Sequence, residues 1–284
     1  MLKDKKEFIK LLGVFVIEVL IVMAISFGKT KFLEITGFEY NILVATLILD
    51  ILLVLVTVLY TRMKGEGFLE AYNIKKIKVG TVFLTLFLTM VASPMFVFAN
   101  VFSQLFVPNT MVQSMDLLMN TSLLNTFIAV AIIAPISEEL IMRGFFQNRF
   151  DKIMPFAASA ILSGFLFGVL HLNFNQFCYA WVLGILFAYT NRASGSTVTS
   201  ILMHFFVNGS NTIMLAFMKM AVQSAGNGGQ DIGAAAESVR ADGVTIKVMV
   251  VIFGVLAIGS FFISRLLINV IAKHEGTMEV TTTE

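Results

Sequence analysis

Cysteine, histidine and charged residues are all scarce in this chain of 284 residues. The single cysteine, Cys178, excludes an internal disulfide and is expected to be a buried thiol. Charged residues make up 13% of the chain, whereas a soluble domain carries about 25%. Bulk water therefore cannot be the main solvent of the folded protein.

Other absences exclude whole classes of function. The net charge is only +2 and no basic block is present, so we expect no nucleic-acid partner. No internal repeat is found of the kind that marks inverted-repeat transporters. The chain has three histidines and no H-E-x-x-H motif, so the sequence does not favour a zincin-type metal site.

Apolar residues are abundant instead, at 57% of the chain with a mean hydropathy of +0.88. Because a helix that spans a bilayer needs about 20 mostly apolar residues, the sequence predicts an all-α polytopic membrane protein. About eight spans are expected, at residues 8–27, 42–60, 80–102, 122–141, 154–172, 176–191, 196–218 and 246–271. The first apolar run exceeds the roughly 7–15 residues of a signal peptide, so we expect it to be retained as a span.

Lysine and arginine are concentrated at both chain ends and in the connections that would share their side of the membrane. By the positive-inside rule both termini should be cytoplasmic. We expect a single membrane domain, residues 1–284, with an amphipathic outer connection at 103–121 and a flexible outer loop at 221–244.

Charged or imidazole side chains inside the apolar runs are the main functional clue, because they are costly in lipid. In the first and second spans Glu18 and Asp50 stand alone, and a structural or protonated carboxyl is the favoured interpretation, with a proton path as the alternative. Arg265 is near the end of the last span and can reach the membrane surface. The remaining four are Glu138, Glu139, His171 and His204, all in the fourth to seventh spans.

The segment "EELIMR" places Glu139 and Arg143 four residues apart, so they share a helix face and are predicted to form an ion pair. Glu138 points about 100° away, which leaves it free for another role. If the fourth helix continues to Asp151 and Lys152, Glu138 lies about 20 Å inside the membrane. Only such a long helix brings it to the depth of the two histidines.

Two further spacings put polar groups on single helix faces. The segment "FGVLH" places Phe167 and His171 four residues apart, and "HFFVN" does the same for His204 and Asn208. A desolvated carboxylate beside a histidine can deprotonate water, and N–H donors can stabilise the oxyanion that forms. The alternative is zinc held by two histidines and a carboxylate, here His171, His204 and Glu138, with an open fourth position.

The three motifs E-E-x-x-x-R, F-x-x-x-H and H-x-x-x-N, in this order, resemble the CAAX protease and bacteriocin-processing family, also called Abi, of intramembrane proteases. The family includes type II CAAX prenyl proteases. The resemblance covers about 120–218, the expected four-helix catalytic core, and "TNRASGS" resembles the family's turn before the third motif.

The resemblance implies a role for each motif residue. Glu138 would be the general base, assisted by His171, and His204 and Asn208 would form the oxyanion site. Supporting roles would fall to Glu139, Arg143 and Phe167. No cofactor is favoured, with zinc as the alternative.

The implied activity is an intramembrane endopeptidase in the plasma membrane of a prokaryote, acting on a peptide or lipidated protein in the bilayer. Family members are linked to bacteriocin immunity and peptide maturation. Two other classes stay open: a non-proteolytic immunity or binding protein with the same fold, and a proton-coupled transporter using Glu18 and Asp50.

Overall fold

The computed structural model describes residues 2–37, 41–107, 121–224 and 243–277. In the helix Val198–Ser224, side chains are described through Met220. Within these ranges the chain is helical and contains no strand. The helices before the centre of the chain are α1 (Lys5–Thr36), α2 (Ile42–Met63), α3 (Phe68–Ala71) and α4 (Val79–Ser103). Those after the centre are α10 (Phe156–Leu170), α11 (Phe174–Ser194), α12 (Val198–Ser224) and α14 (Gly243–Glu275).

Between them runs one long segment, here called helix four, built from five consecutive pieces without a break in the chain direction. These pieces are α7 (Leu123–Thr126), η1 (Phe127–Ile133), α8 (Ala134–Glu139), η2 (Leu140–Gln147) and α9 (Asn148–Ile153). The predicted long fourth helix is therefore confirmed. Its two η pieces are π-helices, in which the backbone hydrogen bonds span five residues.

Each of the eight predicted spans coincides with a helical segment, which confirms an all-α polytopic membrane protein. Of the described helices, six are long and apolar enough to cross a bilayer, namely α1, α2, α4, helix four, α12 and α14. The exceptions are α10, which has only 15 residues, and α11, which is long enough but more polar. Each buries polar side chains against neighbouring helices, among them Ser159 and Ser163 on α10 and Asn175 and Asn191 on α11.

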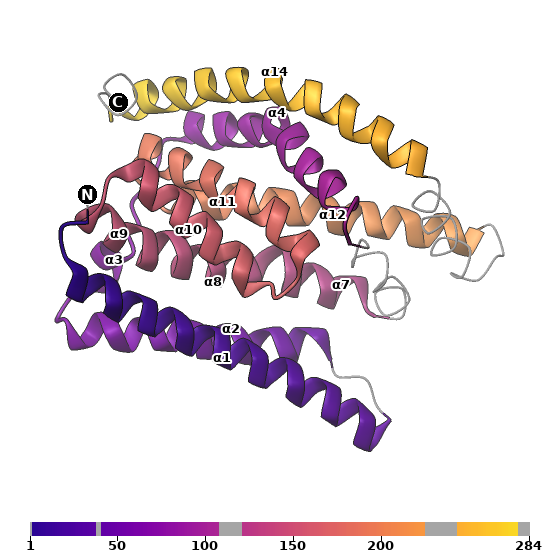
Figure 1. Cartoon of the computed structure of the whole chain (residues 1–284), viewed down its shortest axis with the longest axis horizontal. Helices are drawn as coiled ribbons and strands as arrows, with labels where there is room; N and C mark the ends of the chain where they lie inside the picture. The colour runs from indigo at the N-terminus through magenta and orange to yellow at the C-terminus, as the bar shows by residue number, and fades with distance from the viewer. Residues whose placement is uncertain (1, 38–40, 108–120, 225–242, 278–284) are drawn as a thin grey trace.

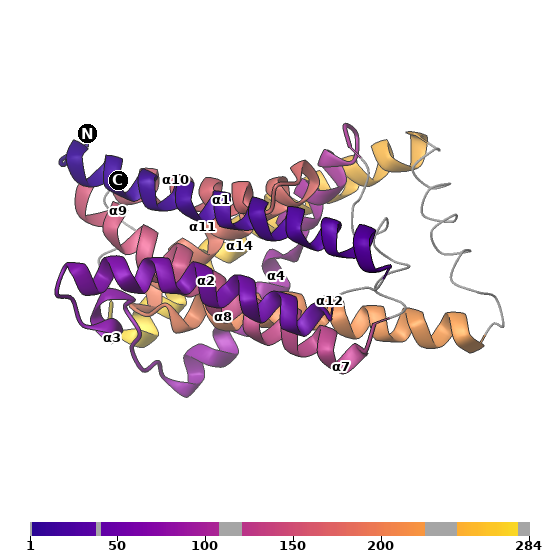
Figure 2. The ribbon, with the colours of Figure 1, turned by 90° about the horizontal axis from the view of Figure 1, so that it is seen from below.

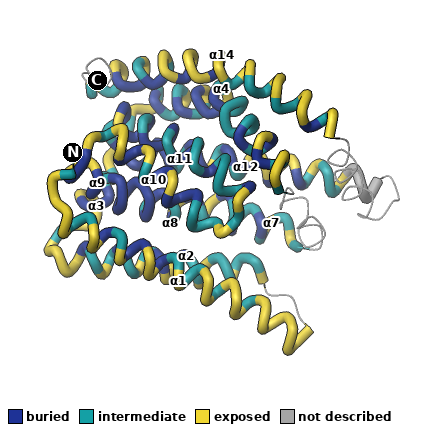
Figure 3. The backbone as a smooth tube through the Cα atoms, viewed as in Figure 1, coloured by how far each residue is buried: buried dark blue, intermediate teal, exposed yellow. Residues whose placement is uncertain are grey.

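The helices form three groups in space (Figure 1). One group is the α1 and α2 pair, another is the α4 and α14 pair, and between them lie helix four, α10, α11 and α12. The view turned by 90° shows the same helices running along one common direction (Figure 2). Dark blue, buried residues are concentrated in the middle group, whereas α1 and α14 carry long exposed faces (Figure 3).

Those exposed faces are apolar, with Val16 and Phe27 on α1 and Val255 and Phe262 on α14 more than half exposed. Aliphatic and aromatic side chains at such exposure suit a hydrocarbon environment. The middle group, in contrast, buries polar and charged side chains between helices. We therefore expect the functional site among the buried polar residues of the middle group.

Both termini lie at the same end of the bundle (Figure 1). At that end the Lys3 amide donates to the Ile153 carbonyl at 2.7 Å, and the Lys78 amide donates to the Glu275 carboxylate at 2.8 Å. This agrees with the expectation that the termini share one side of the membrane; that the side is cytoplasmic stays a prediction. The predicted amphipathic connection and flexible loop fall largely on 108–120 and 225–242, outside the described residues.

Candidate active site

Helix four carries the paired glutamates on its short α-helical piece, α8, with a π-helix on each side. The α-helical geometry used to predict side-chain faces therefore holds for only part of this segment, because Phe127–Ile133 and Leu140–Gln147 are π-helical. π-Helical turns are rare and occur frequently at functional sites. The local signal was Pro135, in the first turn of α8, which cannot donate a backbone hydrogen bond.

The predicted ion pair within this helix is present. Arg143 Nη1 lies 3.2 Å from Glu139 Oε1, and both side chains are 0% exposed. The guanidinium is also enclosed by two aromatic rings, at 4.5 Å from the centroid of Phe167 and 5.2 Å from that of Phe187. A buried cation is therefore held by one carboxylate and two π faces.

His204, on α12, lies between the two glutamates. Its Nδ1 is 3.1 Å from Glu139 Oε1, and its Nε2 is 3.8 Å from Glu138 Oε2. The two carboxylates differ in access, because the side chain of Glu138 is 28% exposed and that of Glu139 is 0% exposed. The expected asymmetry is thus seen in the geometry: Glu139 is enclosed by two partners and Glu138 is open.

The hydrogen bonds set the proton positions on the two imidazoles. His171 Nδ1 lies 2.9 Å from the Phe167 carbonyl, which can only accept, so Nδ1 carries the proton and Nε2 of the neutral ring is a free acceptor. By the same argument His204 Nδ1 donates to the Glu139 carboxylate. With Nδ1 donating to Glu139, His204 can also donate from Nε2 only when the ring carries both protons.

Phe167 joins these groups at the centre of the site. Its ring makes edge contacts with His171 at 5.0 Å and with His204 at 5.7 Å, in addition to the Arg143 guanidinium. The Phe167 ring therefore lies against the imidazoles of both His171 and His204. Within the described residues no hydrogen bond or ion pair joins Glu138 to His171, and the expected assistance of Glu138 by His171 stays a prediction.

Asn208 lies one turn beyond His204 on α12, as its spacing predicted. Its Nδ2 donates to the Val130 carbonyl of η1 at 2.8 Å. One of its two N–H groups is therefore engaged with helix four, and the amide carries a second N–H besides.

Close helix packing makes room for the buried arginine. Gly164 on α10 faces α11, where an added Cβ would lie 2.9 Å from the Trp181 carbonyl oxygen. Gly184 on α11 is more demanding, since a Cβ there would lie 2.6 Å from Gly164 Cα and 2.7 Å from Arg143 Nη2. Sequence reasoning missed Gly184, because only the partner helix shows what a side chain would meet.

The two isolated carboxylates of the first spans have different surroundings. Asp50, 6% exposed on α2, lies near Ser137 and close enough to Glu138 for electrostatic interaction. Glu18, on α1, is 0% exposed and neither of its carboxyl oxygens has a hydrogen-bond partner. Asp50 therefore borders the site, whereas Glu18 contacts none of its residues through a hydrogen bond or ion pair in the described part of the chain.

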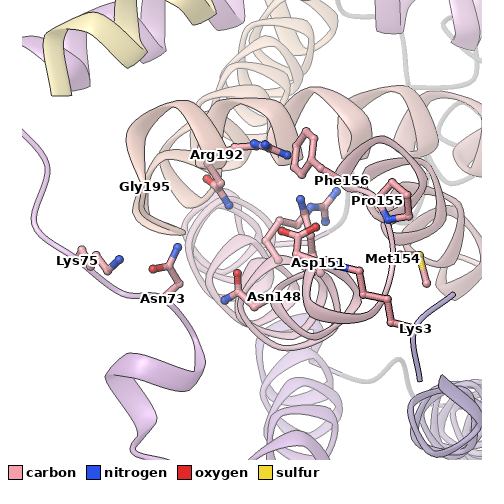
Figure 4. Close-up of a pocket in the computed structure, with 13 residues that line it drawn as sticks. Lys3, Asn73, Lys75, Asn148, Asp151, Met154, Pro155, Phe156, Arg192 and Gly195 are labelled. Atoms are coloured by element: carbon pink, nitrogen blue, oxygen red, sulfur yellow. The ribbon is translucent and has the colours of Figure 1, made fainter. Parts of the chain in front are cut away.

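A polar pocket of about 510 Å³ lies at the end of the bundle that holds the termini. It shares Arg143 with the ion pair, and Figure 4 shows Asp151, Arg192 and Lys3 around it. Sequence reasoning did not identify this pocket. Its walls come from the N-terminal segment, the connection after α3, helix four, the turn into α10, and the end of α11.

The alternative zinc ligands can be tested against the arrangement. Among the residues described, no group of three or more His, Cys, Asp or Glu side chains is placed to hold a metal ion. His171 and His204 each use Nδ1 for a hydrogen bond, to the Phe167 carbonyl and to Glu139, which leaves Nε2 of each ring for another contact, so the zinc alternative stays a prediction.

Comparison with known proteins identifies the segment that contains the three motifs. Residues 120–210 match the family model described as type II CAAX prenyl endopeptidase Rce1-like. No curated protein matches the chain. The matched residues span helix four to the first half of α12, and so include both glutamates, Arg143, both histidines and Asn208. Over this segment, about a third of the chain, the protein is therefore similar to the CAAX prenyl endopeptidase family.

Proposed function

We propose that the protein is an intramembrane endopeptidase in which Glu138 activates a water molecule for attack on a peptide bond. The observation that carries the proposal is the unequal environment of the paired glutamates around His204. Glu139 is bound to Arg143 and His204 and fully enclosed, whereas Glu138 is 28% exposed and has His204 Nε2 as its near neighbour at 3.8 Å. Glu138 is the carboxylate that a water can reach.

The chemistry needs no protein nucleophile. Glu138 takes a proton from water as the hydroxide oxygen adds to the substrate carbonyl, which gives a tetrahedral oxyanion. The proton held by Glu138 then passes to the departing amine as the C–N bond breaks. The products are a carboxylic acid and an amine, which become a carboxylate and an ammonium group by transfer of the acid proton, so atoms and charge balance without a covalent intermediate.

His171 and His204 have complementary roles in this scheme. The free Nε2 lone pair of His171 can accept a hydrogen bond from the attacking water and orient it, because its Nδ1 proton is committed to Phe167. His204, oriented by its Nδ1 hydrogen bond to Glu139, donates from Nε2 to the oxyanion when the ring carries both protons. The second N–H of Asn208 adds another donor.

The environment of the site favours a substrate that is itself in the membrane. Helix four, α10 and α12 enclose the polar groups within a bundle whose outer faces are apolar. A lipidated protein or a hydrophobic peptide partitions into the same phase and can reach Glu138 without crossing bulk water. We also propose that the end holding both termini is cytoplasmic, because lysine and arginine are concentrated there.

The test compares Glu138→Gln with Glu18→Gln in purified protein reconstituted in nanodiscs, using a panel of lipidated and hydrophobic peptides and mass spectrometry of the products. Glu18→Gln is the matched control, since it also neutralises a buried glutamate but outside the site. We expect Glu138→Gln to lower the cleavage rate by about 100-fold or more and the control to cleave normally.

Peptides released in cells that express wild type or Glu138→Gln identify the natural substrate. Equal cleavage by Glu138→Gln and wild type would contradict the proposed role of this residue. A wild-type protein that cleaves nothing in either assay, while Glu138→Gln still supports the cellular function, would favour a non-proteolytic immunity or binding protein.

A further inference from the structure

The junction between η1 and α8 leaves a backbone carbonyl without its helical partner. The Ala134 amide donates to the Ala129 carbonyl, five residues back. The next bond in the same register would join residue 135 to Val130, but residue 135 is proline and has no N–H. The Val130 carbonyl therefore cannot be satisfied by that bond.

An unsatisfied carbonyl is especially costly inside a membrane, where water is not present to replace the missing donor. Here the donor comes from another helix. Asn208 Nδ2 on α12 lies 2.8 Å from the Val130 carbonyl oxygen. The amide side chain thus occupies the place of the absent backbone N–H.

The surrounding contacts make this junction a closely fitted part of the bundle. Ser137 Oγ lies 3.0 Å from the carbonyl oxygens of both Ile133 and Ala134. On α12 the residue after Asn208 is Gly209. A Cβ added to Gly209 would lie closest to Phe127 and Ala131 of η1. The two helices are therefore in direct contact where the hydrogen bond forms.

We propose that Asn208 is a positioning residue that replaces the N–H missing at Pro135 and so ties α12 to the break in helix four. Four residues before it on α12, His204 makes the second tie, to Glu139. The two bonds together set the register of α12 against α8. That register places the His204 imidazole between the two glutamates.

The hydrogen bond from Asn208 Nδ2 to the Val130 carbonyl is called the clamp from here on. It is compatible with the proposed oxyanion role of Asn208, because an amide nitrogen has two N–H groups and the clamp uses one. The clamp is inferred from the missing N–H of Pro135 and the hydrogen bond of Asn208 to the Val130 carbonyl, and this inference does not depend on peptidase activity. Only its effect on turnover rests on the proposed function.

A double-mutant cycle between Asn208→Ala and Pro135→Ala tests the clamp. Alanine at residue 135 restores an N–H in register with the Val130 carbonyl, so the amide of Asn208 is no longer needed there. We expect Asn208→Ala alone to lower Tm in nanodiscs by about 5 °C. In the Pro135→Ala background the same change should lower Tm by less than half as much.

The matched control is Pro94→Ala, which removes a proline from the interior of α4, a helix whose carbonyls Asn208 does not contact. The loss caused by Asn208→Ala should be unchanged in that background. Equal losses in the wild-type and Pro135→Ala backgrounds, or no loss at all, would overturn the clamp. If Asn208→Ala alone yields no folded protein, recovery in the double variant supports the proposal and its failure refutes it.

Turnover separates the clamp from the chemistry. If Asn208 also serves the oxyanion, the double variant should regain Tm while kcat stays low and KM changes little. Recovery of kcat together with Tm would make Asn208 a positioning residue alone. Thermal coupling in a protein without peptidase activity would leave the clamp standing and reject the proposed function.

Discussion

Replacing Arg143 by methionine removes the guanidinium and keeps an unbranched apolar chain in the same space. In the folded protein that guanidinium is 0% exposed and lies 3.2 Å from Glu139 Oε1. Without it, Glu139 remains a fully buried carboxylate with only His204 as an ionic partner. Breaking a buried pair by removing one member costs about 3–5 kcal/mol, mainly because the other charge stays buried.

The two aromatic contacts add to that cost. Phe167 and Phe187 enclose the guanidinium at 4.5 and 5.2 Å from their centroids, and desolvated cation–π contacts contribute about 2 kcal/mol each. Methionine recovers part of this through its own contacts with the rings. We therefore expect Arg143→Met to lower the free energy of unfolding by about 4 kcal/mol.

Adding Glu139→Gln to the same protein removes the stranded charge. The double variant Glu139→Gln/Arg143→Met should be more stable than Arg143→Met alone by about 2 kcal/mol, although it has lost one more native group. Unfolding in mixed micelles with increasing denaturing detergent measures all four members of the cycle. A double variant less stable than either single one, or a loss below about 1 kcal/mol for Arg143→Met, would refute the account of a mutually dependent buried pair.

Three further predictions follow from the same geometry. Glu138→Gln should leave Tm within about 2 °C of wild type while abolishing cleavage. Glu139→Gln should lower both Tm and the cleavage rate. The reverse pattern in thermal scans and peptide assays would make Glu139 the base and Glu138 the structural carboxylate. Gly184→Ala should cost about 1–3 kcal/mol because its Cβ would lie 2.6 Å from Gly164 Cα, whereas Gly259→Ala on α14, with nothing within 4 Å, should be neutral or stabilising in the same unfolding assay. Cleavage should survive prolonged chelation, and metal analysis of active protein should give far less than one equivalent of zinc; a stoichiometric zinc required for turnover would contradict the metal-independent scheme.

Several features of the site were accessible from sequence spacing. The Glu139–Arg143 pair depends only on helical periodicity, and it forms although part of the intervening helix is π-helical. The need for a long fourth helix followed from depth, and the segment does extend to Ile153. The contact of Phe167 with His171 follows from the same four-residue spacing.

Other features required the packed bundle. His204 was expected to serve the oxyanion and to face Glu138, but it also donates to Glu139, which determines which of its nitrogens carries a proton. Asn208 was expected to act on substrate, and one of its N–H groups is engaged with a carbonyl 78 residues earlier in the chain. Pro135 was present in the motif segment, but its consequence depends on which donor another helix brings.

The sequence by itself determined the solvent, the helix positions and the local pair, because apolar run length and spacing along one helix are properties of a continuous segment. Tertiary structure alone decided how far each glutamate is exposed, that His204 lies between them, and that Asn208 hydrogen-bonds to the Val130 carbonyl of helix four. These relations depend on the register of α12 and α10 against helix four. That register is set by close helix contacts and by hydrogen bonds between residues far apart in the chain, which no local pattern encodes.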